Sequence, residues 1–261
     1  MQKFVSFNRD GFKHQPVAMI YKIALQRNIL LLLMLIFFHH GGLTAQETGI
    51  KRYGVAVIDN LATYRTQVKD DTSKRMVELR TLLPGVRYDL RYATANNFMH
   101  RRMYTPPTRH TFLRAPAAQA LAAVQRELGS QGYGLKIFDA YRPYSVTVSF
   151  WELVKDERYV ANPSKGSGHN RGLAVDLTIV DLKTGQELDM GTGFDNFTDT
   201  AHQGFTGLPD TVLKNRELLK TMMQKHGFTP LETEWWHYYW PNDKNYEVLD
   251  IPFAALRKPV K

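Results

Sequence analysis

Apolar residues follow two different spacings along the chain, and each spacing predicts a different kind of element. From Leu173 to Ile179 every second residue is aliphatic, which is the pattern of a strand with one face turned to a core. Stretches at 116–128 and 208–226 instead carry apolar residues at helical spacing, each with Pro near its start and Gly just beyond its end. The chain is therefore expected to contain both strands and helices.

The same pattern predicts further short elements between these. We expect strands at 86–92, 134–138 and 235–240, a hairpin turn at 183–185, and a helix that follows Pro143 and runs to about residue 154. Residues 46–80 are mixed and polar, and they are expected to form an irregular N-terminal arm. The whole pattern predicts one α+β domain over residues 81–261, with an antiparallel sheet and helices packed against it.

The first 45 residues have the pattern of an export signal. Basic residues precede an uninterrupted apolar run at 29–38, which suits a signal peptide and is too short to span a bilayer comfortably. The small residue Ala45 favours cleavage after it, and Met19 is an alternative start because the leader before the apolar run is unusually long. We therefore expect a signal peptide at 1–45 and a periplasmic protein, with a form anchored in the membrane by an uncleaved signal as the alternative.

Composition narrows the choice of chemistry. The chain has 261 residues, 43% of them hydrophobic and 12% aromatic, which is enough for a packed core. Its formal net charge is +9, and removal of residues 1–45, with five basic side chains and one acidic, leaves about +5. The basic residues are scattered among acidic ones, which argues against a nucleic-acid partner. Cysteine is absent, so a transition-metal site must use His, Asp and Glu, a donor set that favours hydrolytic chemistry.

Two distant segments carry such donors. Asp176 lies in the predicted strand on the face opposite the aliphatic residues, where a carboxylate is costly unless it is paired or metal-bound. Taken alone, Asp176 fits a salt bridge or an exposed sheet face equally well, and His169 fits an ordinary surface histidine of a Gly-rich loop. Glu234 and His237 would point to opposite faces of an ideal strand. If both side chains act at one site, the strand must have a bulge or an end at this point. Together the four residues supply three metal ligands and a base for a water molecule, which favours a single metal centre on the sheet.

Arg142 follows an apolar strand and stands directly before Pro143. Its planar set of donors is suited to stabilising a developing oxyanion. Alternatively, Arg142 pairs with Asp139 and only braces the turn. The residues by themselves slightly favour this second explanation.

These motifs resemble those of the zinc D-alanyl-D-alanine dipeptidases of the VanX type, within the family that also holds zinc D,D-carboxypeptidases of peptidoglycan. The resemblance covers roughly residues 84–255. It rests on Ser-x-His-x6-Asp, matched at Ser167, His169 and Asp176, and on Glu-x-Trp-His, matched at Glu234 and His237. The resemblance implies one Zn2+ per chain, with the ligands His169, Asp176 and His237, and with Glu234 as the catalytic base.

Further matches imply how the substrate is held. The segment at Tyr92 resembles one whose tyrosine helps to close the pocket, and the segment at Asp195 resembles one whose aspartate approaches the free amino group of the substrate. Ser167 lies near that end, and Arg142 matches the arginine that steadies the tetrahedral intermediate. The resemblance thus implies hydrolysis of a small dipeptide, D-Ala-D-Ala, to two D-alanines.

Two alternatives to this function follow from the same residues. A zinc D,D-carboxypeptidase would use the same ligands to trim peptidoglycan stem peptides, and it would not require a free amino group. A non-catalytic wall-binding module would keep zinc for stability only. Glu234 and Arg142 argue against that module, because a purely structural metal site needs neither.

Overall fold

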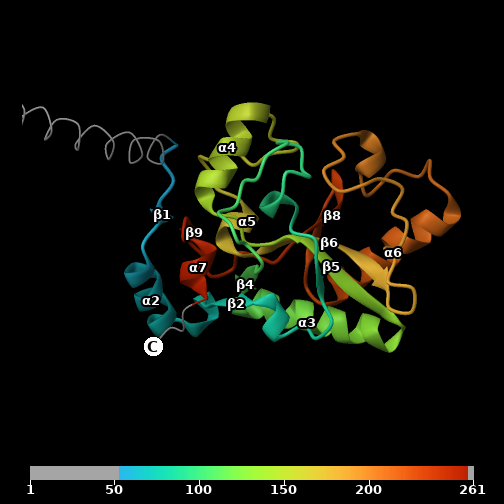
Figure 1. Ribbon diagram of the computed structural model, residues 1–261, viewed down its shortest axis with the longest axis horizontal. Helices are drawn as coiled ribbons and strands as arrows, with labels where there is room; N and C mark the ends of the chain where they lie inside the picture. The colour runs from blue at the N-terminus through green and yellow to red at the C-terminus, as the bar shows by residue number, and fades with distance from the viewer. Residues whose placement is uncertain (1–52, 258–261) are drawn as a thin grey trace, which may run out of the picture. The chain divides into compact units, whose positions relative to one another are not determined.

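The computed structural model describes residues 53–257, and a five-stranded sheet lies at its centre (Figure 1). The strands, in their order across the sheet, are β3 (Arg87–Tyr88), β5 (Tyr133–Asp139), β6 (Ala174–Asp181), β8 (Glu234–Tyr239) and β7 (Thr229–Leu231). β3 is parallel to β5, whereas all other neighbours are antiparallel. The predicted α+β class is confirmed, and the sheet departs from the expected antiparallel pattern only in this pair at its edge.

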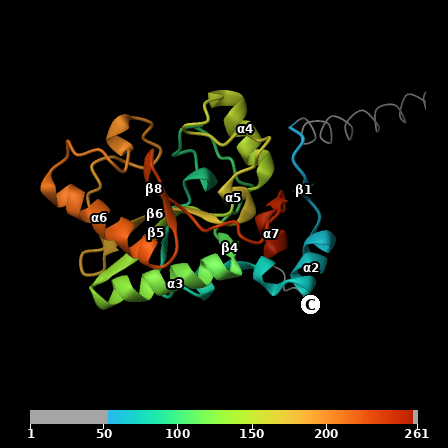
Figure 2. The ribbon, with the colours of Figure 1, turned by 180° about the vertical axis from the view of Figure 1, so that it is seen from behind.

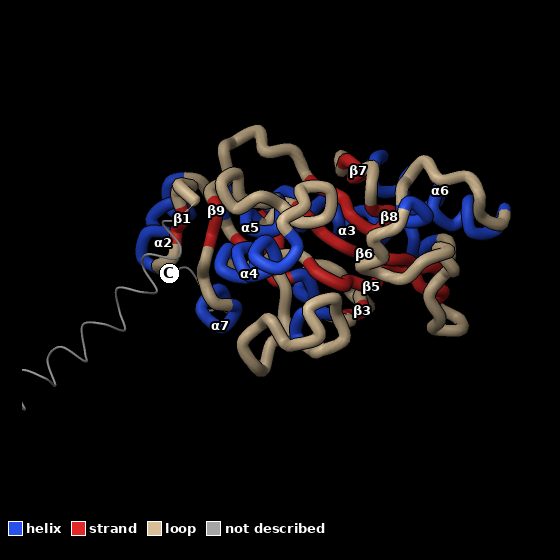
Figure 3. The backbone as a smooth tube through the Cα atoms, turned by 90° about the horizontal axis from the view of Figure 1, so that it is seen from above, coloured by secondary structure: helices blue, strands red, loops and turns tan. Residues whose placement is uncertain are grey.

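Helices lie on both sides of the sheet, with α3 on one side and α4 on the other (Figure 1; Figure 3). The helices of the described part are α2 (Leu61–Asp70), α3 (Ala115–Ser130), α4 (Tyr144–Val154), α5 (Gly168–Arg171), α6 (Asp210–Lys225) and α7 (Phe253–Leu256). Pro116 stands in the first turn of α3, and α4 begins directly after Pro143, where the fixed φ of proline suits a helix start. The helices predicted at 116–128 and 208–226 are thus confirmed as α3 and α6, and Figure 2 shows both from behind.

β6 is buried on both of its faces, and this places Asp176 inside the protein. Every residue from 174 to 180 is buried, and the aliphatic Val175, Leu177 and Ile179 belong to the main hydrophobic core. Asp176 points to the opposite face because side chains alternate along a strand. Its exposure is only 2%, which excludes the explanation of an exposed sheet face.

Residues 53–80 are more regular than the sequence indicates. α2 follows Asn60, whose side chain accepts a hydrogen bond from the N–H of Thr63 at 2.8 Å. Two small sheets pair β1 (Val57–Ile58) with β9 (Val248–Leu249) and β2 (Met76–Glu78) with β4 (Phe112–Arg114). The expectation of an irregular arm is therefore wrong for this part of the chain. The sequence does not indicate α2 because only Tyr64 and Val68 of this helix are buried, and two apolar positions give a weak periodic pattern.

The strand predicted at 86–92 is shorter than expected. After β3 the chain enters a 3-10 turn, η3 (Arg91–Ala93), in which the N–H of Ala93 donates to the carbonyl of Leu90. The alternating sequence does not distinguish this local turn from a continued strand. The turn matters because it carries Tyr92, which is 2% exposed.

Within the described part, no helix is both long enough and apolar enough to cross a membrane. The predicted signal peptide at 1–45 lies outside the described residues, as does the beginning of the predicted arm. The location of the protein therefore stays a prediction.

Candidate metal centre and active site

Asp176 and His237 are neighbours across two paired strands. In the antiparallel pairing of β6 with β8, Asp176 lies directly opposite His237, and residues opposed in this way have their side chains on the same face. Asp176 Oδ1 and His237 Nδ1 are 2.9 Å apart. Two predicted ligands from distant segments therefore meet through the register of the sheet.

His169 comes from α5, a single helical turn just before β6. The Ser167 hydroxyl accepts a hydrogen bond from the N–H of Asn170, and the Asn170 side chain accepts one from the N–H of Ser167, so the turn is capped reciprocally. His169 Nδ1 lies 2.7 Å from the carbonyl oxygen of Ala140. This nitrogen therefore carries the proton and donates it there, which leaves the lone pair on Nε2.

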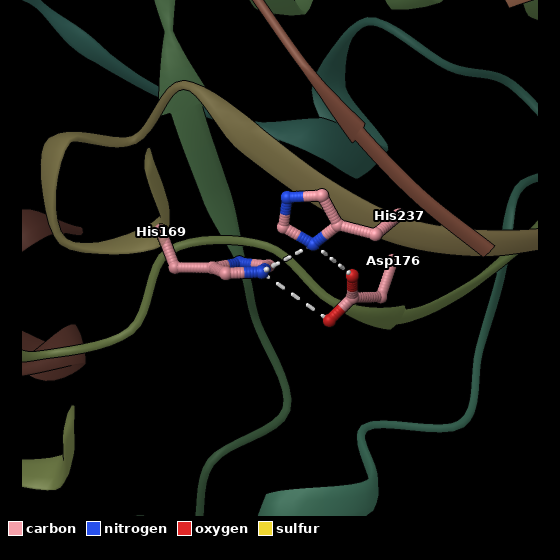
Figure 4. Close-up of side chains that lie close together, drawn as sticks. All are labelled: His169, Asp176 and His237. Carbon is pink, nitrogen blue, oxygen red and sulfur yellow. Dashed lines mark hydrogen bonds and ion pairs between the residues drawn. The ribbon is translucent and has the colours of Figure 1, made fainter. Parts of the chain in front are cut away.

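The three donor atoms form a triangle (Figure 4). His169 Nε2 lies 3.3 Å from Asp176 Oδ2 and 3.3 Å from His237 Nδ1, and the ligand atoms all lie within 4.8 Å of one another. A tetrahedral site with metal bonds of about 2.0–2.1 Å separates its ligand atoms by about 3.3 Å. Two imidazole nitrogens at this separation need a shared proton or a cation between them. The residues present thus fit a zinc ion, in donor type and in spacing.

The charges at this metal triangle (His169, Asp176 and His237) favour a cation. Burial opposes ionisation of Asp176, but the adjoining imidazoles hold the pKa of Asp176 well below its usual value. Burial would lower the pKa of His237, whereas the hydrogen bond to Asp176 raises it above the usual value. A cation at His237 Nδ1 competes with a proton for the same lone pair, so metal binding is expected to release protons.

Glu234 is the first residue of β8 and lies beside the metal triangle. The pairing of β7 with β8 is irregular between Pro230 and Leu231, and Leu231 opposes Glu234. The predicted bulge or strand end is thus present, and Glu234 and His237 line the same cavity, with Oε2 and Nδ1 3.8 Å apart. Glu234 is 7% exposed, and burial raises its pKa to about 8. A cation at the adjoining triangle favours the ionised form of Glu234, and in that form the carboxylate is suited to accept a proton from water.

Arg142 combines both roles considered from the sequence. Its Nε and Nη2 contact Asp139 Oδ2 at 3.0 and 2.9 Å, so it does brace the turn after β5. Its Nη2 also lies 3.8 Å from Asp176 Oδ2, and the guanidinium faces the rings of Tyr92 and Phe150. The Asp139 carboxylate thereby holds a cationic fork at the edge of the metal triangle.

These groups line a cavity of about 300 Å3, and the predicted substrate residues Tyr92, Ser167 and Asp195 line the same cavity. The Tyr92 hydroxyl donates to Asp195 Oδ1 at 2.9 Å. Asp195 Oδ2 is buried and has no hydrogen-bond partner among residues 53–257. Burial raises the pKa of Asp195 to about 7, although the bond from Tyr92 opposes this. Ser167 Oγ accepts the capping bond of α5 and keeps its own proton available for donation.

Tyr104 is a neighbour of the site that the sequence pattern does not indicate. Its hydroxyl donates to Asp139 Oδ1 at 2.6 Å, and Asp139 is fully buried. Asp139 lies opposite Asp176 after an irregularity in the β5–β6 pairing, and its Oδ2 is 3.8 Å from His169 Nδ1. The position of Asp139 at the end of an apolar strand was a usable signal for this role. Tyr104 stands in a loop without any periodic pattern and offered none.

Comparison with known proteins identifies relatives that match most of the chain. The D-ala-D-ala dipeptidase family model matches residues 72–256. The D-alanyl-D-alanine dipeptidase of Escherichia coli strain K12 is 34% identical over 189 residues, which cover 72% of this chain and 96% of that protein. That of Enterococcus faecalis strain V583 is 32% identical, with 67% and 92% covered. A solved structure of the LdcB LD-carboxypeptidase gives a TM-score of 0.36 at 22% identity over 63% of this chain and 69% of that one, a likeness too distant to bear on activity.

The fold, the metal triangle and these matches define a metallopeptidase. The chain belongs to the D-Ala-D-Ala dipeptidase family. The resemblance drawn from two short motifs is thereby confirmed.

Proposed function

We propose that this protein hydrolyses the dipeptide D-Ala-D-Ala to two D-alanines with one zinc ion per chain, held by His169, Asp176 and His237. The observation that carries the proposal is the convergence of these three ligands with Glu234 at one cavity. The relatives named D-alanyl-D-alanine dipeptidase support the choice of substrate.

Each residue of the site has a separate role in the proposed reaction. A zinc ion at the triangle supplies a Lewis acid and a water of lowered pKa. Glu234 accepts a proton from the attacking water and passes it to the leaving amine. Arg142, held by Asp139, donates hydrogen bonds to the negative charge that develops on the carbonyl oxygen. Because Asp139 already orients the guanidinium before substrate binds, the Arg142 side chain does not have to move during the reaction.

Asp195, Tyr92 and Ser167, which line the same cavity, bind the amino end of the substrate in this proposal. Asp195 Oδ2 is a buried acceptor without a partner among the described residues, and it suits a substrate ammonium group. Tyr92 holds this carboxyl group through its hydrogen bond to Oδ1, and Ser167 lines the same cavity. A volume of about 300 Å3 is at the small end of ligand sites, which suits a dipeptide better than a long peptide.

The test is a comparison of three substrates with the zinc-loaded full chain: D-Ala-D-Ala, L-Ala-L-Ala and N-acetyl-D-Ala-D-Ala. We expect turnover of the first and little of the others. Preference for the acetylated peptide would replace the dipeptidase by the D,D-carboxypeptidase. Equal cleavage of L-Ala-L-Ala would contradict the proposed specificity for D-amino acids.

We also propose export to the periplasm through residues 1–45. The support is the basic leader and the apolar run at 29–38. Expression of the full chain, cell fractionation and N-terminal sequencing of the product test this, with a new terminus after Ala45 expected. A product that stays in the cytoplasm would contradict export, and a membrane-bound product with an intact leader would indicate the anchored form.

A further inference from the structure

The loop at 190–202, between β6 and α6, carries Asp195. It contains one short regular element among its residues, the 3-10 turn η4 (Asp199–Ala201). Asp195 itself has a φ of 60°, a left-handed conformation that is uncommon outside glycine. Such a backbone conformation persists only where the surrounding contacts fix it.

Arg216 of α6 ties the two ends of this loop together. Its Nε donates to the carbonyl of Met190 at 2.8 Å, its Nη2 to that of Thr200 at 2.9 Å, and its Nη1 to that of His202 at 3.2 Å. Arg216 is only 5% exposed, and burial lowers its pKa. The three hydrogen bonds compensate the burial of this guanidinium, and all three carbonyl acceptors belong to the loop.

Two further anchors act on the segment just before Asp195. Trp235 of β8 donates from Nε1 to Thr192 Oγ1 at 2.8 Å. The ring of Phe194 stacks on that of Phe138 in β5, with centroids 4.9 Å apart. The position of the Asp195 carboxyl group therefore depends on contacts from β5, β8 and α6 together.

We propose that Arg216 is a positioning residue for recognition of the free amino group of the substrate, an inference that rests on the proposed function. Arg216 is not among the residues that line the catalytic cavity, and it lines a separate hollow with Gln203 and Lys220. It therefore acts on substrate only through the loop. With the three hydrogen bonds from Arg216 in place, Asp195 is held where it lines the cavity. Without them the loop relaxes and the ammonium group loses its partner.

The test uses two substrates of equal size, D-Ala-D-Ala and D-lactoyl-D-alanine, in which a hydroxyl group replaces the ammonium group. In Arg216→Met we expect KM for D-Ala-D-Ala to rise about tenfold, the effect of weakening one charge-assisted hydrogen bond. The metal content, kcat and the KM or Ki of the analogue should stay close to those of the wild type. Arg216→Lys keeps the charge but cannot reach three carbonyl groups, so it should show a smaller change in the same direction.

Further variants separate positioning from general stability. Thr192→Val removes the contact from Trp235 without removing a buried cation, and it should shift the preference between the two substrates in the same direction. In an Asp195→Asn background, Arg216→Met should change the preference no further. Arg87→Met is a control on another loop, because the exposed Arg87 also donates to a loop carbonyl, that of Gly185 at 2.6 Å, and its loss should leave the preference between the two substrates unchanged.

The outcomes distinguish the inference from the function on which it rests. Equal losses for both substrates in the Arg216 and Thr192 variants, or an unchanged preference in folded variants, would overturn the inference alone. If the wild-type enzyme binds the analogue as tightly as D-Ala-D-Ala, the proposed recognition of the free amino group is wrong, and the inference about Arg216 is wrong with it.

Discussion

Replacement of Glu234 by Gln tests the assignment of the catalytic base. Gln keeps the size of the side chain and removes its ability to accept a proton. Glu234 Oε2 is 3.8 Å from His237 Nδ1, beyond hydrogen-bond distance, so the metal triangle does not depend on this carboxylate. Glu234→Gln is therefore expected to keep its metal and lose turnover.

The size of the loss follows from what the base supplies. General-base catalysis contributes about 10²–10⁴-fold, which corresponds to about 3–5 kcal/mol of the activation barrier. Because Glu234 is only 7% exposed, bulk water is a poor substitute for it. We expect kcat to fall by about 10³-fold or more, with KM nearly unchanged. Release of D-alanine, measured with D-amino-acid oxidase, and zinc content by mass spectrometry should be determined on the same sample.

Glu157→Gln is the control for this experiment. Glu157 is an exposed residue at the same cavity, and its carboxylate is bonded to Lys165 Nζ at 2.7 Å. This variant should keep wild-type activity, because its carboxylate is already paired away from the metal triangle. A Glu234→Gln enzyme with full metal and kcat within about tenfold of wild type would refute the assignment. Loss of the metal would instead make Glu234 part of the metal site.

Three further predictions concern the neighbouring residues. Asp176→Asn removes the carboxylate between the two imidazoles, and zinc per chain after dialysis should fall well below one; retention of full zinc would exclude Asp176 as a ligand. Arg142→Lys keeps the charge but loses the fork held by Asp139, and kcat should fall by about 10²-fold or more at unchanged metal content. Because burial raises the pKa of Asp195 to about 7, its carboxylate is lost as pH falls through 7, and KM for D-Ala-D-Ala should rise there. A KM that is flat from pH 6 to 8, or an Asp195→Asn enzyme with the same acid limb, would remove Asp195 from this role.

Local sequence patterns predicted the elements well where hydrophobic spacing was strong. α3, α6 and β6 follow from their periodicity and from Pro and Gly near their ends. The sequence pattern does not indicate α2, because few of its side chains are buried. It predicts too long a strand at 86–92, because apolar and polar residues still alternate in the turn that follows β3.

The site shows a different limit, because its geometry depends on contacts between distant segments. Spacing alone proposes His169, Asp176 and His237, but only the register of β6 with β8 brings Asp176 opposite His237. For Arg142 the sequence offered bracing or catalysis as alternatives. The structure shows that the bracing contact with Asp139 is what holds the guanidinium at the cavity, so the two explanations are not exclusive.

The balance of buried charge explains why one cavity suits both a divalent metal and a substrate with a free amino group. Besides the exposed Glu157, four carboxyl groups lie at or next to the cavity, those of Asp139, Asp176, Asp195 and Glu234. Like charges in a buried site raise the cost of ionisation, and burial does raise the pKa of both Asp195 and Glu234. In the proposed complex each carboxyl group has its own positive partner: Arg142 for Asp139, the metal for Asp176, the substrate ammonium for Asp195, and the proton of the attacking water for Glu234. Removal of Arg142 or of the metal leaves a buried carboxylate uncompensated, whereas Asp195 and Glu234, whose pKa values are raised, take up a proton when their partners are absent. Binding of the metal is therefore expected to stabilise the fold around the cavity.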